Sequence, residues 1–299
     1  LYSPINKIFI YILYLCFTIK KLMRKVKDKS IELEILIATM NRTTLDFLSK
    51  MFSGQNYLDF NVLIINQTID SKLLKSECSN IRVINTFEKG LSKSRNIAIK
   101  NATKPICLLA DDDIVFNEGF ENLILKAHQD YPYPIITFQT QTTNNEMYWD
   151  YPLISCFHNE NIREKTLSIE ITFKKEELKE LGFDERFGLG SIFEDGENYI
   201  FLSEAKKKKM KLWFVNNTLS MHNPISSSDD VKSNRLLYAK SAIHFYKYGN
   251  LSYFWVFKFI FFIYRKKYIS FNEISSKIKI GFKGINDFKV YHFGSIVTR

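Results

Sequence analysis

Pro105-Ile-Cys-Leu-Leu-Ala-Asp-Asp-Asp113 is the most informative segment of the chain for its fold class. Its first part is an almost uninterrupted apolar run, which is typical of a strand buried on both faces of a parallel sheet. Three carboxylates follow at once, and they would repel one another unless a metal ion or a positive side chain lay beside them. Because Mg²⁺ and Mn²⁺ prefer hard oxygen ligands, the segment predicts a metal site at the end of this strand. The alternative is a solvated acidic turn.

Repeated β–α units precede this segment. The predicted strands cover residues 33–38, 61–65 and 81–84. The predicted helices cover residues 44–51 and 91–101, and residues 70–78 form a short helix or loop. Such repeats predict an α/β fold with a doubly wound sheet and right-handed crossovers. Ligands of such sheets bind beyond the carboxyl ends of the strands. The polar segments expected there are Thr39-Met-Asn-Arg42, Asn66-Gln-Thr68 and Asp111-Asp-Asp113.

Composition excludes several classes of protein. The 299 residues are 45% hydrophobic and 25% charged, which are ordinary globular values. The mean hydropathy of −0.16 argues against several membrane spans. The 4 cysteines are scattered and form no C-x-x-C pair, so neither a disulfide framework nor a zinc cluster is expected. This cysteine usage favours a reducing compartment.

The net charge of +10 is unevenly distributed and indicates three regions. Residues 1–30 carry 7 basic and 1 acidic side chains, and residues 231–299 carry 13 basic and 2 acidic side chains. The central domain, residues 31–230, holds 22 basic and 29 acidic side chains. An acidic centre argues against a nucleic-acid partner, because such proteins present a basic body.

Residues 1–30 are predicted to form an extension outside the central domain. A largely apolar run fills residues 7–19, and basic residues follow it. The run is shorter than the roughly 20 residues that cross a bilayer. It also lacks the small-residue cleavage site of a signal peptide. Because Met23 stands just before the first predicted strand, translation could begin there, with residues 1–22 upstream of the start; both possibilities stay open.

Residues 231–299 are predicted to be a basic, aromatic helical region. Within it, residues 251–264 form an apolar aromatic run that only Lys258 interrupts, and Arg265-Lys-Lys267 follows. Trp and Tyr favour the headgroup level of a membrane, and basic residues attract anionic lipids. We therefore expect a helix that lies on the cytoplasmic face of a membrane. The alternative is a buried helix that closes the core.

Several motifs of the chain resemble those of family 2 glycosyltransferases. Residues 35–42, 90–98 and 111–113 are similar to the nucleotide-binding loop, the G-x-x-x-x-R-N segment and the metal-binding D-x-D of that family. Residues 187–190, 196–202 and 222–224 are similar to its acceptor-side motif, its catalytic-base motif and the histidine that closes its metal site. The resemblance covers roughly residues 33–225. It implies the GT-A fold, a doubly wound mixed sheet, here with a C-terminal helical, membrane-associating extension.

The resemblance also implies a role for individual residues. The donor-binding residues would be Thr39, Asn41, Arg42, Asn66, Arg95, Asn96, Asp111 and Asp112. The metal ligands would be Asp111, Asp113 and His222, holding Mn²⁺ or Mg²⁺. The catalytic base would be Glu197 first and Asp195 second, with Glu194 a third possibility. The acceptor side would include Gly188, Gly190 and Trp149.

Two departures from the family pattern stand out. Many relatives carry an acid at the end of the second strand, where this chain has Asn66 and Gln67. The base motif of the family holds paired acids, whereas Asn198 follows Glu197 here. These departures keep open whether a carboxylate contacts the nucleobase and which acid is the base.

The expected function is that of a metal-dependent, inverting glycosyltransferase of hexosyltransferase type. It would move a sugar from a nucleotide-sugar donor, a UDP-sugar first of all, to a lipid-linked or polysaccharide acceptor in bacterial surface-glycan biosynthesis. The enzyme would be cytoplasmic and peripheral on the inner face of the membrane. One alternative is a nucleotidyltransferase, which also holds a metal with carboxylates on a doubly wound sheet. The other is a catalytically inactive, membrane-docked module that binds sugar nucleotides, which Asn66 and Asn198 keep open.

Overall fold

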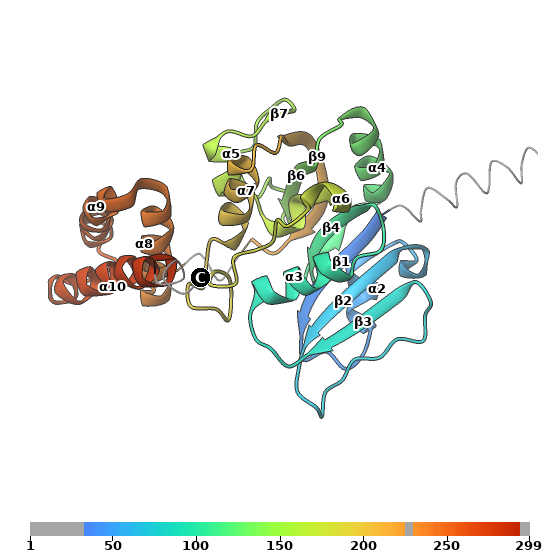
Figure 1. Ribbon diagram of the computed structural model, residues 1–299, viewed down its shortest axis with the longest axis horizontal. Coiled ribbons are helices and arrows are strands. Elements are labelled where there is room, and N and C mark those ends of the chain that lie inside the picture. The colour runs from blue at the N-terminus through green and yellow to red at the C-terminus, as the bar shows by residue number, and fades with distance from the viewer. Residues whose placement is uncertain (1–32, 225–229, 294–299) are drawn as a thin grey trace, which may run out of the picture.

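The computed structural model describes residues 33–224 and 230–293 (Figure 1). The predicted extension at residues 1–30 therefore lies outside the described residues. The strands are β1 (Leu33–Met40), β2 (Asn61–Gln67), β3 (Ile81–Thr86), β4 (Ile106–Asp111), β5 (Val115–Phe116), β6 (Ile135–Thr142), β7 (Cys156–Phe157), β8 (Ile171–Lys174) and β9 (Leu212–His222). The α-helices are α2 (Asp46–Met51), α3 (Leu91–Asn101), α4 (Phe120–Asp130), α5 (Glu160–Lys165), α6 (Lys175–Leu178), α7 (Glu197–Lys207), α8 (Asn234–Tyr248), α9 (Ser252–Arg265) and α10 (Ile274–Phe293). Short 3₁₀ turns are η1 (Tyr57–Asp59), η2 (Ser168–Glu170), η3 (Gly249–Leu251) and η4 (Phe271–Glu273).

One mixed sheet forms the centre of the described chain. Its strands run in the order β3-β2-β1-β4-β8-β6-β9-β5, and β7 pairs with β9 at one side. The four predicted strands are confirmed as β1 to β4, and the helices predicted at 44–51 and 91–101 are confirmed as α2 and α3. Residues 70–78 form a loop. The structure therefore confirms a mixed α/β sheet with helices on both faces.

The parallel half of the sheet brings its polar strand ends to one edge. Strands β1, β2, β3 and β4 are parallel neighbours. In their register Ala38 pairs with Asp111, and Thr39 pairs with Asn66. The segments that follow β1, β2 and β4 consequently start side by side.

The other half of the sheet is mostly antiparallel and delivers a histidine to the same edge. Strand β8 lies antiparallel between β4 and β6, and β9 runs parallel to β6 with two register shifts. Strand β5 pairs antiparallel with β9, with Val115 opposite Met221. This pairing places His222, at the end of β9, beside the segment that follows β4.

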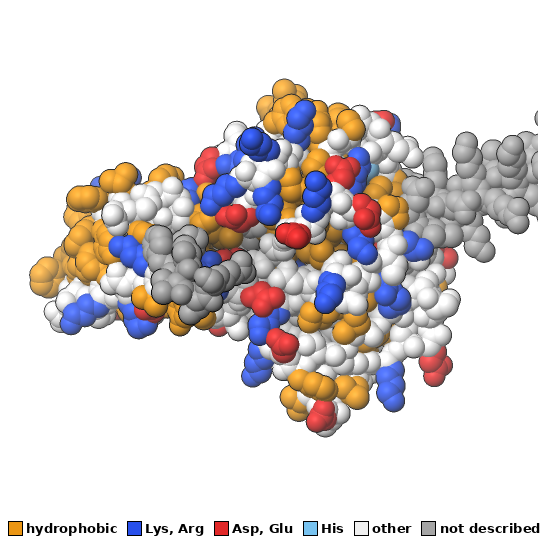
Figure 2. Space-filling view, in the orientation of Figure 1, with side chains coloured by type: hydrophobic (Ala, Val, Ile, Leu, Met, Phe, Trp, Pro, Cys, Tyr) orange, Lys and Arg blue, Asp and Glu red, His pale blue; other side chains and the backbone are white. Residues whose placement is uncertain are grey.

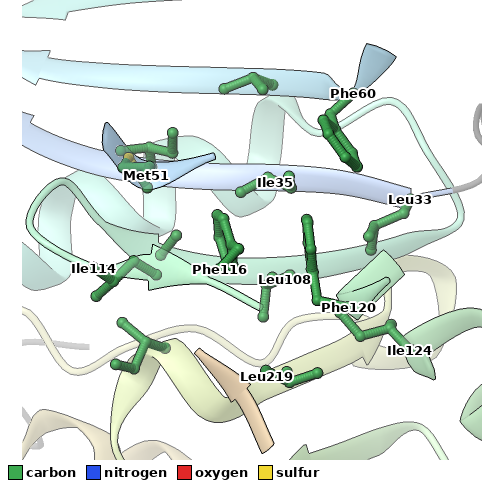
Figure 3. Close-up of a cluster of buried hydrophobic side chains, with 14 of the residues drawn as sticks. Leu33, Ile35, Met51, Phe60, Leu108, Ile114, Phe116, Phe120, Ile124 and Leu219 are labelled. Atoms are coloured by element: carbon green, nitrogen blue, oxygen red, sulfur yellow. The ribbon is translucent and has the colours of Figure 1, made fainter. Parts of the chain in front are cut away.

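Two apolar layers hold the helices on the sheet. Helices α2 and α4 pack on one face, where Phe52 stacks on Phe60. Phe116 stacks on Phe120 in the same cluster (Figure 3). Helices α3, α6 and α7 cover the other face through a second cluster that includes Phe173. Side chains of β1 alternate between the two clusters, as expected for a strand with helices on both faces.

Helices α8, α9 and α10 form a separate layer that packs against the segment before α7 (Figure 1). Phe187 and Phe193 stack on each other at 5.0 Å, and both contact the Phe288 ring of α10. Helix α10 lies so close to α8 that a Cβ at Gly284 would stand 2.3 Å from the Tyr238 carbonyl oxygen. Within residues 33–224 and 230–293, no helix combines the length and the apolar character needed to cross a membrane.

Candidate active site

Arg95 connects two of the predicted site carboxylates. Its guanidinium contacts Asp111 Oδ1 at 3.1 Å and Glu197 Oε1 at 2.9 Å, and it donates to Asn198 Oδ1 at 3.2 Å. The side chain is 3% exposed and lies over the Phe183 ring. Burial disfavours its charged form, but the carboxylates of Asp111 and Glu197 outweigh burial and raise the pKa of Arg95. Arg95 therefore joins the end of β4 to the start of α7.

Asp112 fastens the segment after β4 to the segment after β1. Its carboxylate accepts hydrogen bonds from Thr39 Oγ1 at 2.5 Å and from Arg42 Nε at 2.6 Å. The Arg42 guanidinium also lies over the Phe47 ring at 5.1 Å. The Arg42 side chain remains 42% exposed, so it stays accessible to a ligand while Asp112 orients it.

Asp113 faces His222 across the end of the sheet. The distance from Asp113 Oδ1 to His222 Nε2 is 3.5 Å, and His222 Nδ1 bonds the Asn223 carbonyl oxygen at 2.7 Å. Contact between the two side chains lowers the pKa of Asp113 and raises the pKa of His222. Each aspartate of the acidic run thus has its own side-chain partner: Arg95 for Asp111, Arg42 for Asp112 and His222 for Asp113.

The Asp113–His222 pair is the part of the site that suits a divalent cation. Its donor set is one carboxylate oxygen and one imidazole nitrogen, a combination that Mn²⁺ accepts. Asp111, the other predicted carboxylate ligand, is bound by Arg95 and by the Ser168 hydroxyl at 3.1 Å. Among the described residues, no three His, Cys, Asp or Glu side chains form a ligand cluster. Mg²⁺ and Mn²⁺ sites commonly take one or two protein ligands and complete their shell with substrate phosphates and water, so the pair fits such an ion.

A pocket of about 190 Å³ opens at the ends of β1, β2 and β3. Its lining residues are Met40, Asn41, Gln67, Thr68, Ile69, Lys72, Phe87, Glu88 and Lys89. Met40 and Phe87 are 60% and 61% exposed, which gives the pocket uncovered apolar surface. Asn41 adopts a left-handed φ of 56°, a conformation that asparagine tolerates better than most residues. The pocket therefore offers apolar faces and side-chain amides, the contacts that a planar, hydrogen-bonding ring can use.

Asn66 fixes the backbone of the loop that follows β1, next to this pocket. The side chain is fully buried, and its amide nitrogen donates to the Arg42 carbonyl oxygen at 3.0 Å and to Asn85 Oδ1 at 2.9 Å. Its amide oxygen accepts from the Arg42 backbone N–H at 3.1 Å. Asn66 thus holds the loop after β1, whereas Asn41 and Gln67 line the pocket.

Asn96 follows Arg95 on α3 and bonds the chain that leads to the predicted acceptor-side loop. Its amide exchanges hydrogen bonds with the Phe183 backbone, at 2.9 Å to the carbonyl oxygen and 2.7 Å from the N–H. It also donates to Glu185 at 3.1 Å. The predicted donor residue Asn96 therefore lies against protein and positions the segment before Gly188.

The predicted acceptor-side loop, residues 187–196 and called the acceptor loop below, packs on the start of α3. Ser92 donates to the Phe187 carbonyl oxygen at 2.6 Å. Gly188 and Gly190 have φ values of 98° and 77°, which side chains rarely adopt. A Cβ at Gly188 would stand 3.1 Å from Ser92 Oγ and 3.3 Å from Glu197 Cγ. Glycine is therefore required both by the turn and by the closeness of Glu197.

Three acids lie at the end of this loop. Glu197 is the first residue of α7 and is held by Arg95, while Glu194 pairs with Arg235 at 3.3 Å. Burial raises the pKa of Asp195, and the nearby charge of Glu197 adds to this rise. Of the three acids, Glu197 is the one that Arg95 links to Asp111 in the acidic run after β4.

The Tyr148 ring lies between Trp149 and His222 of the Asp113–His222 pair. The Tyr148 ring contacts Trp149 at 5.3 Å and His222 at 5.7 Å, both edge to face. Trp149 is 36% exposed, so its ring has a free surface at this side of the site.

Sequence reasoning missed three residues that shape the site: Ser168, Tyr148 and Phe183. Each is a common residue type without a motif, and each reaches the site from an element distant in sequence. Only the neighbourhood of Tyr148 to the predicted Trp149 gave a signal that could have found it.

Comparison with known proteins assigns the chain to a family. The family model described as glycosyl transferase family 2 matches residues 34–190, which is more than half of the chain, and the chain therefore belongs to glycosyl transferase family 2. No curated protein sequence matches it.

Solved structures of TarS from S. aureus are similar to the chain at low identity. One crystal structure of TarS 1–349 has 14% identity and a TM-score of 0.49, with 88% of this chain and 92% of that chain covered. A longer TarS structure has 16% identity and a TM-score of 0.47; the match covers 70% of this chain and only 39% of the longer one. A third structure, TarS 1–349 in complex with UDP-GlcNAc, has 12% identity and a TM-score of 0.47, with 72% and 66% covered.

Proposed function

We propose that the chain is a metal-dependent, inverting glycosyltransferase of hexosyltransferase type that uses a nucleotide-sugar donor. The observation that carries the proposal is the meeting of three features at one edge of the sheet: the pocket, the Asp113–His222 pair and Glu197. Membership of glycosyl transferase family 2 supplies the reaction class.

The pocket would hold the base of the nucleotide. Met40 and Phe87 provide apolar surface for a planar ring, and the amides of Asn41 and Gln67 can bond its edge. Arg42 stands between this pocket and Asp112, where its guanidinium can contact a diphosphate oxygen. A uracil base is the first candidate, because the family resemblance implies a UDP-sugar.

Asp113 and His222 would hold Mn²⁺ or Mg²⁺ next to the diphosphate. When bound, such a cation neutralises the negative charge that grows on the leaving diphosphate. Asp111 is held by Arg95 and Ser168 and would fix the end of β4 beside the cation. The loss of either Asp113 or His222 would then weaken donor binding in the presence of the metal.

Glu197 would accept the proton of the acceptor hydroxyl as that oxygen bonds the anomeric carbon. The bond from the anomeric carbon to the diphosphate oxygen breaks in the same step, and its electron pair leaves with the nucleoside diphosphate. A single displacement of this kind inverts the anomeric centre. Arg95 holds the Glu197 carboxylate in place for this transfer.

The acceptor would be a lipid-linked or polysaccharide glycan of bacterial surface-glycan biosynthesis, bound beside Gly188, Gly190 and Trp149. The reaction would take place at the cytoplasmic face of the membrane, with the enzyme peripheral to it.

The first test is thermal unfolding of the protein with UDP, GDP, CDP or dTDP, each with and without Mn²⁺. A ligand at 100 times its dissociation constant stabilises a protein by about 2.7 kcal/mol. We expect a metal-dependent rise in Tm with UDP that Asp113→Asn abolishes. The matched variant Asp130→Asn, at the exposed end of α4, should keep the rise.

Other outcomes assign a different function. Release of pyrophosphate from a nucleoside triphosphate would indicate a nucleotidyltransferase. Nucleotide binding with neither sugar transfer nor donor hydrolysis would indicate an inactive binding module. No stabilisation by any nucleotide would contradict the proposed donor site.

A further inference from the structure

We propose that the outward face of α9 is a docking surface for an anionic phospholipid bilayer. Helix α9 has two apolar faces, and the protein covers only one of them. Val256, Ile260 and Ile263 are buried in a cluster that includes Ile285 of α10. This inward face accounts for the packing of α9 on the protein.

The outward face carries a row of phenylalanines where a globular protein normally has polar residues. Phe254, Phe257 and Phe261 are 74%, 49% and 63% exposed, and their spacing places them along one side of the helix. Leu251 at one end and Phe271 beyond the other continue the exposed surface. Hydrophobic side chains accordingly gather at the α9 end of the molecule (Figure 2). A continuous exposed apolar patch of this kind marks an interaction site.

Exposed cations accompany this row. Lys258 lies within it, and Arg265, Lys266 and Lys267 follow at the end of the helix. None of these four side chains has an acidic partner among the residues that the structure describes. The surface therefore combines apolar insertion with positive charge, and its complement is apolar and anionic.

The acids of the C-terminal region are engaged elsewhere. Residues 231–299 contain only two acidic residues, Glu273 and Asp287. Glu273 accepts hydrogen bonds from the backbone N–H and hydroxyl of Ser270, and Asp287 binds Lys283 and the Tyr238 hydroxyl. Neither carboxylate neutralises the cations around the phenylalanine row.

Length and packing fix the orientation of α9 on a bilayer. Its 14 residues span about 21 Å at roughly 1.5 Å per residue, against a hydrocarbon core about 30 Å thick. One side of the helix is fixed to α10, so only the phenylalanine side is available. The helix would therefore lie in the plane of the interface, with Tyr264 and Tyr268 at its edge, where tyrosine is favoured.

Charge favours lipid over two other occupants of this face. A second copy of the chain would bring two sets of the same four cations together. The apolar run at residues 7–19 is followed by further basic residues, so it would add like charge as well. An anionic bilayer is attracted by all of these groups.

The test is sedimentation of the full chain with vesicles of phosphatidylcholine, alone or mixed with phosphatidylglycerol. The inference deepens the proposed location of the enzyme, but vesicle binding needs neither donor nor acceptor, so its failure is distinguishable from failure of the transferase proposal. We expect binding to the mixed vesicles only. The triple variant Phe254→Ser/Phe257→Ser/Phe261→Ser should weaken it at least tenfold, since it removes three inserting side chains.

Matched variants control for exposure and charge. Leu153→Ser/Ile154→Ser changes two side chains that are 90% and 74% exposed before β7, and it should bind like the parent protein. Lys258→Glu/Arg265→Glu should also weaken binding, whereas Lys126→Glu on α4 should not. If the triple variant fails to fold, the charge variants still test the proposal.

Three results would overturn the proposal. The first is the absence of binding to either vesicle, and the second is equal binding by the parent and by the phenylalanine and charge variants. The third is a dimer in solution that the triple variant dissolves, which would assign the face to a second copy of the chain.

Discussion

Arg95 is a buried cation held between carboxylates from two elements, Asp111 at the end of β4 and Glu197 at the start of α7. Removing such a cation leaves two carboxylates close together in a partly buried site. A broken buried ion pair costs about 3–5 kcal/mol, because the remaining charge is desolvated without a partner. Arg95 should therefore matter for folding as well as for the reaction.

We predict that Arg95→Met lowers the free energy of unfolding by about 3 kcal/mol, and that Arg95→Lys lowers it less because the charge remains. Urea denaturation measures both. Arg82→Met is the matched control, since Arg82 also pairs with a buried carboxylate, Glu34, but is 39% exposed. Glu34 keeps its bonds from the Thr103 and Lys104 backbone in that variant. Equal losses for Arg95→Met and Arg82→Met would contradict this role.

A second prediction at this scale separates the three acids of the acceptor loop. Glu197→Gln should reduce kcat by about 10²–10⁴-fold with little change in nucleotide affinity, because it removes the base and keeps the shape. Asp195→Asn and Glu194→Gln should have smaller effects. Steady-state kinetics and nucleotide titration give the two quantities. A larger kcat loss in Asp195→Asn would move the base to that residue.

At the scale of elements, the loop at residues 187–196 contains a glycine turn that lies against Glu197, the proposed base. Gly188 has φ 98°, and its missing side chain leaves room for Ser92 and Glu197. Gly119, the residue before α4, has φ 76° but has no heavy atom within 4 Å of an added Cβ. The two glycines share the backbone requirement and differ in what a methyl group would meet.

We predict that Gly188→Ala and Gly119→Ala each lower the free energy of unfolding by about 1–2 kcal/mol, the cost of a left-handed alanine. Only Gly188→Ala should also lower kcat, because its methyl group displaces Glu197. Thermal unfolding and kinetics on both variants check this. Equal activity in the two variants would show that the loop relaxes without disturbing the base.

The sequence was sufficient for the first four strands and for the order of the site motifs. Those strands are near-continuous apolar runs with polar ends, and parallel pairing puts such ends at one edge. The proximity of Asp113 and His222 was implied by resemblance alone, because it arises from the two-residue strand β5 pairing with β9. No local pattern reveals a strand so short.

Side-chain direction was the other limit of sequence reasoning. Arg95 and Asn96 are neighbours on α3, and successive residues of a helix point about 100° apart. Both were expected at the donor. The structure turns Arg95 toward Asp111 and Glu197, and Asn96 toward the Phe183 backbone, while the predicted contacts with a donor stay a prediction. Which face of α3 meets which segment is decided by packing of the whole domain.

At the scale of the whole molecule, two buried histidines make the fold sensitive to acid. His128 forms a hydrogen bond with Thr172 of β8 at 2.9 Å, and His158 forms one with Thr137 of β6 at 2.7 Å. Burial lowers the pKa of each to about 3. In the unfolded chain the pKa returns to about 6.5, so the unfolded state takes up protons first as the pH falls.

We predict that this contribution to stability is complete above about pH 6.5 and is lost as the pH falls toward 3. Each histidine adds about 1.4 kcal/mol per pH unit to the slope of stability against pH within that window. The variant His128→Gln/His158→Gln keeps a neutral side chain and should show a shallower slope. Urea denaturation between pH 4 and 7 measures it, and an unchanged slope would mean that other groups dominate.

Phe187 and Phe193, from the loop before Glu197, contact the Phe288 ring of α10 edge to face, and α10 in turn packs against α9. Within the described residues, continuous packing thus connects the loop before Glu197 to α10, and α10 to the inward face of α9. For a protein seated on lipid through α9, this packing would set a constant height of the reaction centre above the headgroups. Acceptors would then be sorted by length, according to how far their reactive hydroxyl stands from the bilayer.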